Sequence, residues 1–287
     1  MKRHLSTIVI LVMFIVGSSV LLYPAISEYI NSRNASKVIA VHNEAVEKAA
    51  AEELEQLWAE AREYNLKLSQ DPSAFFAPER LEGYEQLLDI SGAGIMGYID
   101  IDRIKVELPI YHGVDKGVLQ IGVGHLEGSS LPVGGSGTHC VLSGHRGLPS
   151  AKLFTDLDEL TIDDTFTLTI LGRKLTYRVD QIKTVKPGET DDLQIVPGKD
   201  YCTLLTCTPY GINTHRLLVR GVRVDSQAEQ AGIFVPNEAF LIDPLIVTPI
   251  AAIPMLAVLL TIVFISDARK KKTNDTVSKE EKDSNED

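Results

Sequence analysis

The sequence has little cysteine, few aromatic residues and a shortage of positive charge. Its 287 residues include three cysteines, one tryptophan and 6% aromatic residues. Lys and Arg number 28 against 39 Asp and Glu, which gives a formal net charge of −11. A protein that binds nucleic acid through its phosphates needs a basic surface, so this composition argues against nucleic acid as a partner. The apolar content of 44% argues equally against disorder of the whole chain.

The three cysteines, Cys140, Cys202 and Cys207, are too few for a disulfide-stabilised secreted scaffold, and their number is odd. Cys202 and Cys207 do not have the spacing of a zinc-binding pair, and no second pair accompanies them. Residues five apart on a strand point to opposite faces, so these two cannot easily share a metal ion or form a disulfide. We therefore expect no metal, no cofactor and at least one free thiol.

Two uncharged apolar runs indicate a membrane protein. The runs are Ser6–Ser27 and Pro244–Ser266, and each has the ~20 residues that a helix needs to cross the hydrocarbon core. Lys2 and Arg3 precede the first run, and the basic stretch Ala268–Lys272 follows the second. The excess of Lys and Arg on the cytoplasmic side predicts that both termini are cytoplasmic and that the rest lies outside the cell.

The first run has an alternative interpretation as a cleaved signal peptide, with Ala25-Ile26-Ser27 as the cleavage site. With the anchor retained, the chain divides into seven predicted parts. They are a cytoplasmic N-terminus (1–5), a transmembrane helix or signal anchor (6–27), an extracellular helical segment (28–96), a β domain (97–226), a linker (227–243), a transmembrane helix (244–266) and a charged cytoplasmic tail (267–287), which we expect to be disordered.

The segment after the first run is predicted to be helical. Ala35–Leu68 is rich in Ala, Glu, Leu and Lys, and its apolar residues keep the 3–4 spacing of one helix face. Pro72 and Pro78 interrupt this pattern, and we expect a second short helix over Pro78–Leu88.

From Gly97 onward the sequence predicts an all-β domain. Short runs rich in β-branched and aromatic residues alternate with Gly, Pro, Asp and Asn, as in "GYIDI", "HCVLSG", "FTLTI", "YCTLLTC" and "HRLLVRG". This spacing is typical of a sandwich or barrel. Within this part, only Ser150–Leu160 is predicted to be a helix.

Cys207 is the best candidate for a nucleophile. It lies where a predicted strand meets the turn "TPYG", and residues at strand ends can project into a cleft. Cys140 and Cys202 lie inside apolar strands and are expected to be buried. If the strands before and after the turn pair as a hairpin, Cys207 and Arg216 lie near the same end of neighbouring strands. A guanidinium there can stabilise a thiolate or an oxyanion.

The general acid or base is expected among the histidines of the β domain. His145 follows the strand "HCVLS" between two glycines, and His125 in "GVGHLEG" has a similar setting. The residues alone leave both open. His215 adjoins Arg216 on a strand, so its side chain should point to the opposite face.

The segments "VLSGHRGLPSAKLFTDLDEL" and "TLLTCTPYGINTHRLLVRG" resemble the two signature blocks of sortases, membrane-bound cysteine transpeptidases of Gram-positive bacteria. The resemblance extends over about Gly97–Val224. It implies an eight-stranded β-barrel with short helices, in which Cys207 is the nucleophile, His145 the general acid/base and Arg216 the stabilising cation.

More narrowly, the chain resembles class C, pilin-polymerising sortases, because it has a second apolar run, a long helical N-terminal part and the segment "SQDPSAFF". In that class an Asp-Pro-aromatic lid (about residues 70–76 here) covers the site, with Asp near the Arg and the aromatic over the Cys. Asp71 and Pro72 match, but Ser73 stands where the aromatic is expected. Phe75 or Phe76 is the candidate substitute.

The resemblance implies cleavage of a Leu-Pro-x-Thr-Gly-like sorting motif on a pilin subunit and transfer to a Lys amine of the next subunit. The alternatives are a housekeeping sortase that uses a peptidoglycan precursor amine, and a membrane-tethered assembly module without catalysis. A papain-like protease is disfavoured because its Cys opens a helix, whereas Cys207 ends a predicted strand.

Overall fold

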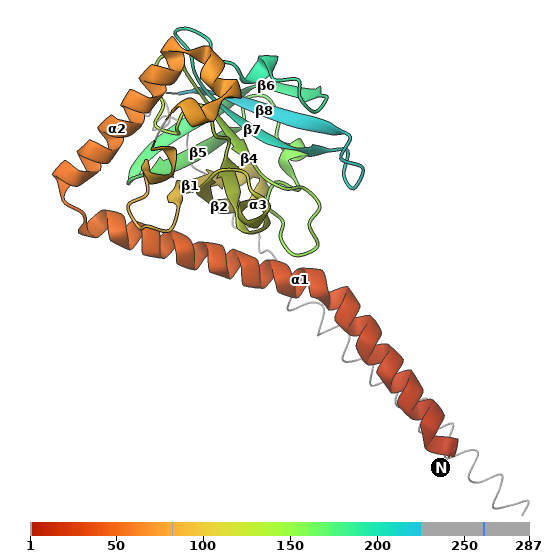
Figure 1. The fold of residues 1–287 in the computed structure, drawn as a ribbon. Helices are drawn as coiled ribbons and strands as arrows, with labels where there is room; N and C mark the ends of the chain where they lie inside the picture. Colours follow the sequence, from red (N-terminus) through yellow and green to blue (C-terminus); the bar gives the residue numbers. More distant parts are fainter. Residues whose placement is uncertain (1, 82, 225–260, 262–287) are drawn as a thin grey trace, which may run out of the picture. The chain divides into compact units, whose positions relative to one another are not determined.

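The structure is a computed structural model and describes residues 2–81, 83–224 and 261. The chain divides into two units near Ile26, and the second, which begins at Ser27, contains the strands (Figure 1). The α-helices in the described residues are α1 (Lys2–Lys48), α2 (Ala51–Gln70) and α3 (Lys116–Ile121). The 3₁₀ helices there are η1 (Pro72–Phe76), η2 (Pro78–Arg80), η3 (Tyr84–Gln86), η4 (Asp102–Ile104), η5 (Leu157–Glu159) and η6 (Asp191–Leu193).

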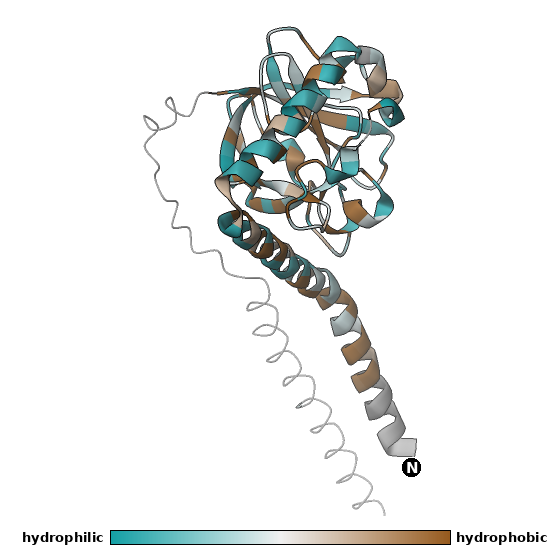
Figure 2. Cartoon of the chain, turned by 60° about the vertical axis from the view of Figure 1, so that its left-hand side comes forward, coloured by the Kyte–Doolittle hydropathy of each residue, from teal (hydrophilic) through white to brown (hydrophobic). Residues whose placement is uncertain are grey.

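The first part of α1 is long and apolar enough to cross a membrane. The segment Leu11–Lys48 has 38 residues and a mean hydropathy of 1.7 in its most apolar window. Hydrophobic residues dominate this part of the helix (Figure 2), and side chains such as Met13 and Leu21 are exposed. The predicted N-terminal span is therefore an apolar helix. The predicted linker, C-terminal span and tail lie outside the described residues, apart from Thr261.

The helix predicted over Ala35–Leu68 is two helices. α1 ends at Lys48, and Ala50 is extended (φ −67°, ψ 146°) before α2 begins. Neither Pro nor Gly marks this break in the sequence, so the local pattern gave no sign of it. The break lets two helices, rather than one straight rod, pack on the β domain (Figure 1).

The β domain is a closed barrel of eight strands, as the family resemblance implied. The strands are β1 (Ile95–Ile101), β2 (Val106–His112), β3 (Val123–His125), β4 (Thr138–Ser143), β5 (Thr165–Ile170), β6 (Arg173–Val185), β7 (Asp200–Thr208) and β8 (His215–Arg223). Their order around the barrel is β1-β2-β3-β4-β7-β8-β6-β5. The β2–β3 and β4–β7 pairs are parallel, and the other pairs are antiparallel.

Alternation of side chains along these strands fills the barrel. In β4 and β7 the residues Cys140, Leu142, Cys202 and Leu204 belong to the central core. Gly97 of β1 allows a close approach between strands, because a Cβ there would lie 2.2 Å from the Thr169 carbonyl oxygen.

α2 closes one side of this core. Its buried residues Trp58, Ala61, Tyr64 and Leu68 recur at helical spacing and belong to the barrel core. Full burial of each large apolar side chain contributes roughly 1.5–3 kcal/mol. Asn65 fixes the register of the helix, since its side chain accepts from Leu131 N (2.7 Å) and donates to Leu131 O (3.1 Å).

Two predicted helices were wrong. Ser150–Leu160 is a chain of turns with one short 3₁₀ helix, η5, because Phe154 and Leu157 are drawn into the core from an irregular backbone. Pro78–Leu88 contains only η2 and η3, separated by Gly83 in the left-handed region (φ 83°). In both segments the burial of a few apolar side chains outweighs weak helix propensity.

Candidate active site

Cys207 and Arg216 are direct partners across two antiparallel strands. Cys207 lies near the end of β7, Arg216 near the start of β8, and the ladder pairs them one to one. Cys207 is a free, half-buried thiol. Directly opposite residues on one face have Cβ atoms about 4.5–5.5 Å apart, so the guanidinium is within reach of the thiol.

The turn between these strands orients Arg216. Its Nη1 donates to the carbonyl oxygens of Asn213 (3.2 Å) and His215 (3.0 Å). Asn213 adopts the left-handed conformation (φ 61°), which Asn tolerates better than most residues. The remaining guanidinium N–H groups make no hydrogen bond within the described residues, so they are free to donate to a bound group.

His145 lies at the end of the neighbouring strand. β4 runs parallel to β7 with Ser143 paired to Leu205, and Gly144 N donates to Leu205 O at 3.0 Å. Extending this register by two residues brings the backbone of His145 level with Cys207. The Thr206 hydroxyl donates to Gly144 O at 2.7 Å and holds the strand end in place. Burial lowers the pKa of His145 below its ordinary value.

The structure distinguishes His145 from the other candidate, His125. His125 is fully buried, and both ring nitrogens have partners: the Tyr84 hydroxyl at Nδ1 (2.9 Å) and the Ser130 carbonyl at Nε2 (2.9 Å). It is a structural core histidine. The sequence could not distinguish the two, because both follow a strand next to glycine.

Cys140 and Cys202 are buried, as expected from their apolar strands. They are register partners on β4 and β7 and both are free thiols. Burial raises the pKa of the Cys202 thiol well above its ordinary value, which keeps that thiol protonated and unreactive. Of the three cysteines, Cys207 alone is partly exposed.

Arg146 is a residue of the site that sequence reasoning missed. Its side chain is only 9% exposed and forms an ion pair with Asp158. Its Nη1 donates to the Thr208 hydroxyl at 3.2 Å, and its guanidinium lies 6.0 Å from the Tyr210 ring centre. Arg146 thus ties the turn after Cys207 to the segment after His145. The only sign of its role in the sequence is that Arg146 directly follows His145.

The predicted lid segment folds as η1, and Asp71 caps it. Asp71 accepts from Ser73 N (3.2 Å) and from the Ser73 hydroxyl, and Arg80 lies 3.8 Å from its other oxygen. The expected contact between Asp71 and Arg216 is not formed in the described residues. Ser73 belongs to this polar cap, since its hydroxyl also accepts from Arg80 at 3.0 Å.

Phe75, and not Ser73, packs against the β domain. It packs on an apolar cluster outside the barrel, which we name the apolar shelf. The shelf consists of Leu126, Val141, Val185, Leu193, Leu205 and Leu218. Leu205 and Leu218 are register partners that lie two residues from Cys207 and Arg216 respectively. The shelf therefore lies on the sheet face that carries Cys207, and Phe75 packs on the part of it near Leu193 and Gly128.

Phe76 lies outside this contact. Its ring meets Phe75 edge-on with centroids 5.1 Å apart, and its side chain remains exposed (69%). Of the two candidate lid aromatics, Phe75 and Phe76, only Phe75 contacts the shelf.

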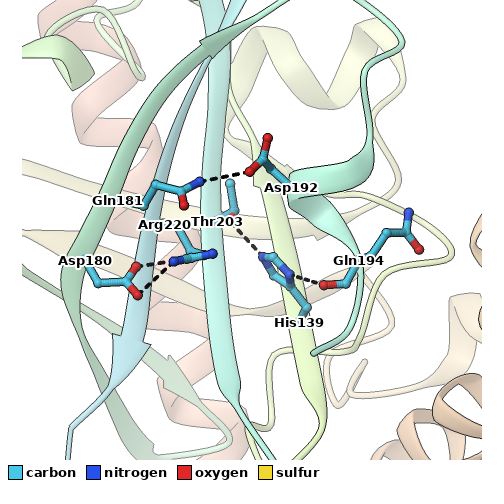
Figure 3. A network of polar contacts seen from close by, with 7 residues as sticks. All are labelled: His139, Asp180, Gln181, Asp192, Gln194, Thr203 and Arg220. Atoms are coloured by element: carbon cyan, nitrogen blue, oxygen red, sulfur yellow. Dashed lines mark hydrogen bonds and ion pairs between the residues drawn. The ribbon is translucent and has the colours of Figure 1, made fainter. Parts of the chain in front are cut away.

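A polar network continues the same face beyond the shelf (Figure 3). His139 donates through Nδ1 to Gln194 O (2.9 Å) and accepts at Nε2 from the Thr203 hydroxyl (2.7 Å). Arg220 pairs with both oxygens of Asp180 at 2.9 and 3.0 Å. His139 thereby connects Gln194 to β4 and β7. Gln194 directly follows η6, whose last residue is Leu193 of the shelf.

Nothing in the described residues resembles a metal centre. No group of three or more His, Cys, Asp or Glu side chains is placed there to share an ion. The grouping of Cys207, Arg216 and His145 at one end of β4, β7 and β8 instead combines a nucleophile, a fixed cation and a titratable imidazole. That set is suited to acyl transfer.

Known proteins resemble this chain over the β domain. The family model described as the sortase domain matches residues 99–224. A curated relative, sortase D of Bacillus subtilis (strain 168), is 32% identical over 131 residues, which cover 45% of this chain and 63% of that protein. The chain thus spans less than two thirds of that relative's length.

Solved structures cover more of the chain. The crystal structure of sortase C1 from Streptococcus agalactiae is 49% identical, with a TM-score of 0.60, and the match covers 66% of this chain and 98% of that one. The X-ray structure of Clostridium perfringens sortase C with the C-terminal cell wall sorting motif is 46% identical, with a TM-score of 0.58, and covers 67% and 100%.

Proposed function

Since the chain belongs to the sortase family, we propose that it is a cysteine transpeptidase. It cleaves a Leu-Pro-x-Thr-Gly-like sorting motif between Thr and Gly and joins the Thr carbonyl to an amine. One observation carries the proposal: a free, half-buried Cys207 faces Arg216 across the β7–β8 ladder.

In the first step the Cys207 thiolate attacks the Thr carbonyl carbon and forms an S–C bond. The carbonyl oxygen becomes an oxyanion, and the free N–H groups of Arg216 stabilise it. The C–N bond to Gly then breaks, and the leaving amine takes a proton from the His145 imidazolium. Burial lowers the pKa of His145, and this makes the imidazolium a readier proton donor.

In the second step an acceptor amine attacks the thioester. Its nitrogen bonds to the Thr carbonyl carbon, the C–S bond breaks, and its proton passes to His145. Cys207 is regenerated as a thiolate. Because the thioester conserves the acyl energy of the cleaved peptide bond, ligation needs no other energy source.

We further propose that the acceptor is a Lys amine of another pilin subunit, so that the enzyme polymerises pili. The similarity to sortase C structures at 46–49% identity supports this choice over a peptidoglycan precursor amine. The basic residues outside the two apolar runs support a catalytic domain on the outer face of the cell membrane with both termini in the cytoplasm.

The test supplies purified full-length chain with a sorting-motif peptide and two competing acceptors, a Lys-containing pilin peptide and a peptidoglycan precursor. Mass spectrometry of the ligated products should show the Lys isopeptide in excess. Cys207→Ala should give no product, whereas Cys140→Ala, at a buried thiol, should retain it. Ligation by the Cys207→Ala chain would refute the nucleophile. Exclusive use of the peptidoglycan amine would favour the housekeeping alternative.

The segment of Asp71, Pro72, Ser73 and Phe75 acts in this proposal as a lid. Phe75 occupies part of the apolar shelf, which extends to Leu205, two residues from Cys207, so an apolar side chain of the sorting motif can use the whole shelf only after Phe75 leaves. Phe75→Ala should therefore raise the rate at which a maleimide modifies Cys207.

Phe76→Ala is the matched control for the lid, because Phe76 is exposed and outside the shelf. It should leave the modification rate near that of the unaltered chain. Equal rates for both variants would show that Phe75 does not restrict access to Cys207.

A further inference from the structure

A cleft lies far from Cys207, at the opposite end of the strands. It has a volume of about 520 Å³ and lies between α2 and the end of the barrel where β4 and β7 begin. Trp58 and Arg62 contribute from α2, and Arg223 from the end of β8. Asp200 and Cys207 are seven residues apart on β7, which at about 3.3 Å per residue separates the two sites by about 23 Å.

The charge of this cleft is opposite to that of the chain. Its lining carries four cations, Arg62, Arg173, Lys174 and Arg223, against the single carboxylate of Asp200. The whole chain has a formal net charge of −11. A concentration of positive charge inside a concave, partly desolvated surface raises the local potential and attracts anions.

Three of these cations form no direct ion pair. Within the described residues, Arg62, Lys174 and Arg223 have no carboxylate within 4 Å, although Asp100 lies near enough to Lys174 and Asp200 near enough to Arg223 to interact electrostatically, whereas Arg173 pairs with Glu55. Asp200 is already engaged, since it accepts from Gly135 N at 2.8 Å and from the Tyr177 hydroxyl at 3.1 Å.

Aromatic rings hold the guanidinium groups in place without neutralising them. Arg62 and Arg173 lie 5.8 and 4.5 Å from the ring centre of Trp58, and Arg223 lies 5.6 Å from that of Tyr177. A ring face orients a cation while leaving its in-plane N–H donors available to a ligand. The cluster is therefore preorganised and still carries its charge.

The loop "VGGSG" supplies further donors to the same cleft. Gly134, Gly135 and Gly137 have φ values of 64°, 122° and 80°, and a Cβ on Gly134 would lie 2.8 Å from an Asp200 oxygen. The backbone N–H groups of Gly134 and Ser136, two residues that line the cleft, donate to no group of the described part of the chain. Such a glycine-rich turn is a common cradle for oxyanions.

Two buried donors at this wall are also unsatisfied. Trp58 is 4% exposed and its Nε1–H has no acceptor among the described residues, and the same is true of Nη1 of Arg223. A buried donor without a partner is destabilising, so two of them at one wall are unusual unless an acceptor binds nearby.

We propose that this cleft is a binding site for a phosphate-bearing ligand. A phosphate monoester offers three acceptor oxygens and up to two negative charges, and a phosphodiester offers two oxygens and one charge. A monoester can therefore satisfy Arg62, Lys174 and Arg223 together, whereas a diester can engage two of these cations at a time. The site is independent of the proposed acyl transfer at Cys207.

Trp58 gives a direct readout because it is the only tryptophan of the chain. The full-length chain in a non-ionic detergent is titrated with inorganic phosphate and with glycerol 3-phosphate, and NaCl keeps the ionic strength constant. The Trp58 fluorescence should change in a saturable manner. Arg62→Gln and Lys174→Gln should each raise the dissociation constant by about tenfold, the loss expected for one charge-assisted contact.

The matched control is Arg178→Gln, which removes a cation of the same strand as Lys174 that is exposed and paired with Asp163 outside the cleft. It should bind as the unaltered chain does. Thermal unfolding of every variant establishes that it is folded.

A third titration identifies the source of the phosphate. Lipid nanodiscs of phosphatidylglycerol are compared with nanodiscs of phosphatidylcholine. An Arg62-dependent response to phosphatidylglycerol alone identifies a lipid headgroup, and a response to free glycerol 3-phosphate identifies a soluble or polymeric phosphate; either supports the site. Absence of a saturable response to all probes, or equal binding by the Arg62→Gln and Arg178→Gln chains, would overturn the proposal.

Discussion

His139 makes the stability of the domain sensitive to acid, and His139→Gln should remove part of that sensitivity. The side chain is 1% exposed, and burial lowers its pKa to about 4. The groups that face it are the Gln194 carbonyl, Asp180 and Asp192, which favour its protonation, and Arg220, which opposes it. In the unfolded chain the same imidazole takes up a proton near pH 6.5.

The sign follows from proton linkage. Between pH 6.5 and about 4 the unfolded state binds a proton that the folded state excludes, so the free energy of unfolding falls as the pH is lowered. The contribution is fully present above pH 6.5. Each pH unit removes about 1.4 kcal/mol at most, so between pH 7.5 and 4.5 the loss from this group is on the order of 2–3 kcal/mol.

Replacement by Gln deletes the titration but also the two hydrogen bonds to Gln194 and Thr203. At pH 7.5 the variant should be less stable by about 1–3 kcal/mol. At pH 4.5 this deficit should have largely vanished, because the unaltered chain has lost a similar amount.

Urea unfolding of the detergent-solubilised chain, followed by the fluorescence of Trp58, measures both free energies. Thr203→Val is the control, since it removes one hydrogen bond and leaves the imidazole; its deficit should persist at pH 4.5. The reasoning is refuted if His139→Gln is destabilised equally at both pH values.

Three further predictions concern the site. A thiol reagent should modify only Cys207 in the folded chain and Cys140 and Cys202 as well after denaturation, which intact mass resolves as one adduct against three. Arg216→Lys, which keeps the charge but loses the planar donors, should lower kcat for ligation by about 10²-fold, and an unchanged kcat would exclude a role in oxyanion stabilisation. Arg146→Lys loses the simultaneous contacts of the guanidinium with Thr208 and Asp158, so it should lower kcat more than it raises KM. A change confined to KM would show that Arg146 does not position the turn after Cys207.

The sequence anticipated the parts of the site that depend on local periodicity. Short β-branched runs predicted the strands, and a hairpin across "TPYGINT" was enough to place Arg216 near Cys207; the ladder pairs the two residues directly. The choice between His145 and His125 needed the family resemblance. Their settings along the chain are alike, and burial separates them only after the barrel has closed.

Features that depend on tertiary packing were not predictable. The break between α1 and α2 falls at two alanines, and the turns that replace the expected helix at Ser150–Leu160 follow from the burial of Phe154. Likewise, Asp71 pairs with Arg80 rather than Arg216, and Phe75 rather than residue 73 contacts the shelf. Each of these features depends on which side chains are buried and which remain accessible once the barrel has closed.

In the proposed reaction, Cys207 forms a thioester with the Thr of a sorting motif. The full-length chain is mixed with a Leu-Pro-x-Thr-Gly peptide without an acceptor amine, quenched in acid and digested for mass spectrometry. The account predicts an adduct of the peptide up to Thr on the fragment that contains Cys207, and its loss when a Lys amine is added before the quench. An adduct on Cys140 or Cys202, or cleavage of the peptide without any covalent intermediate, would contradict it.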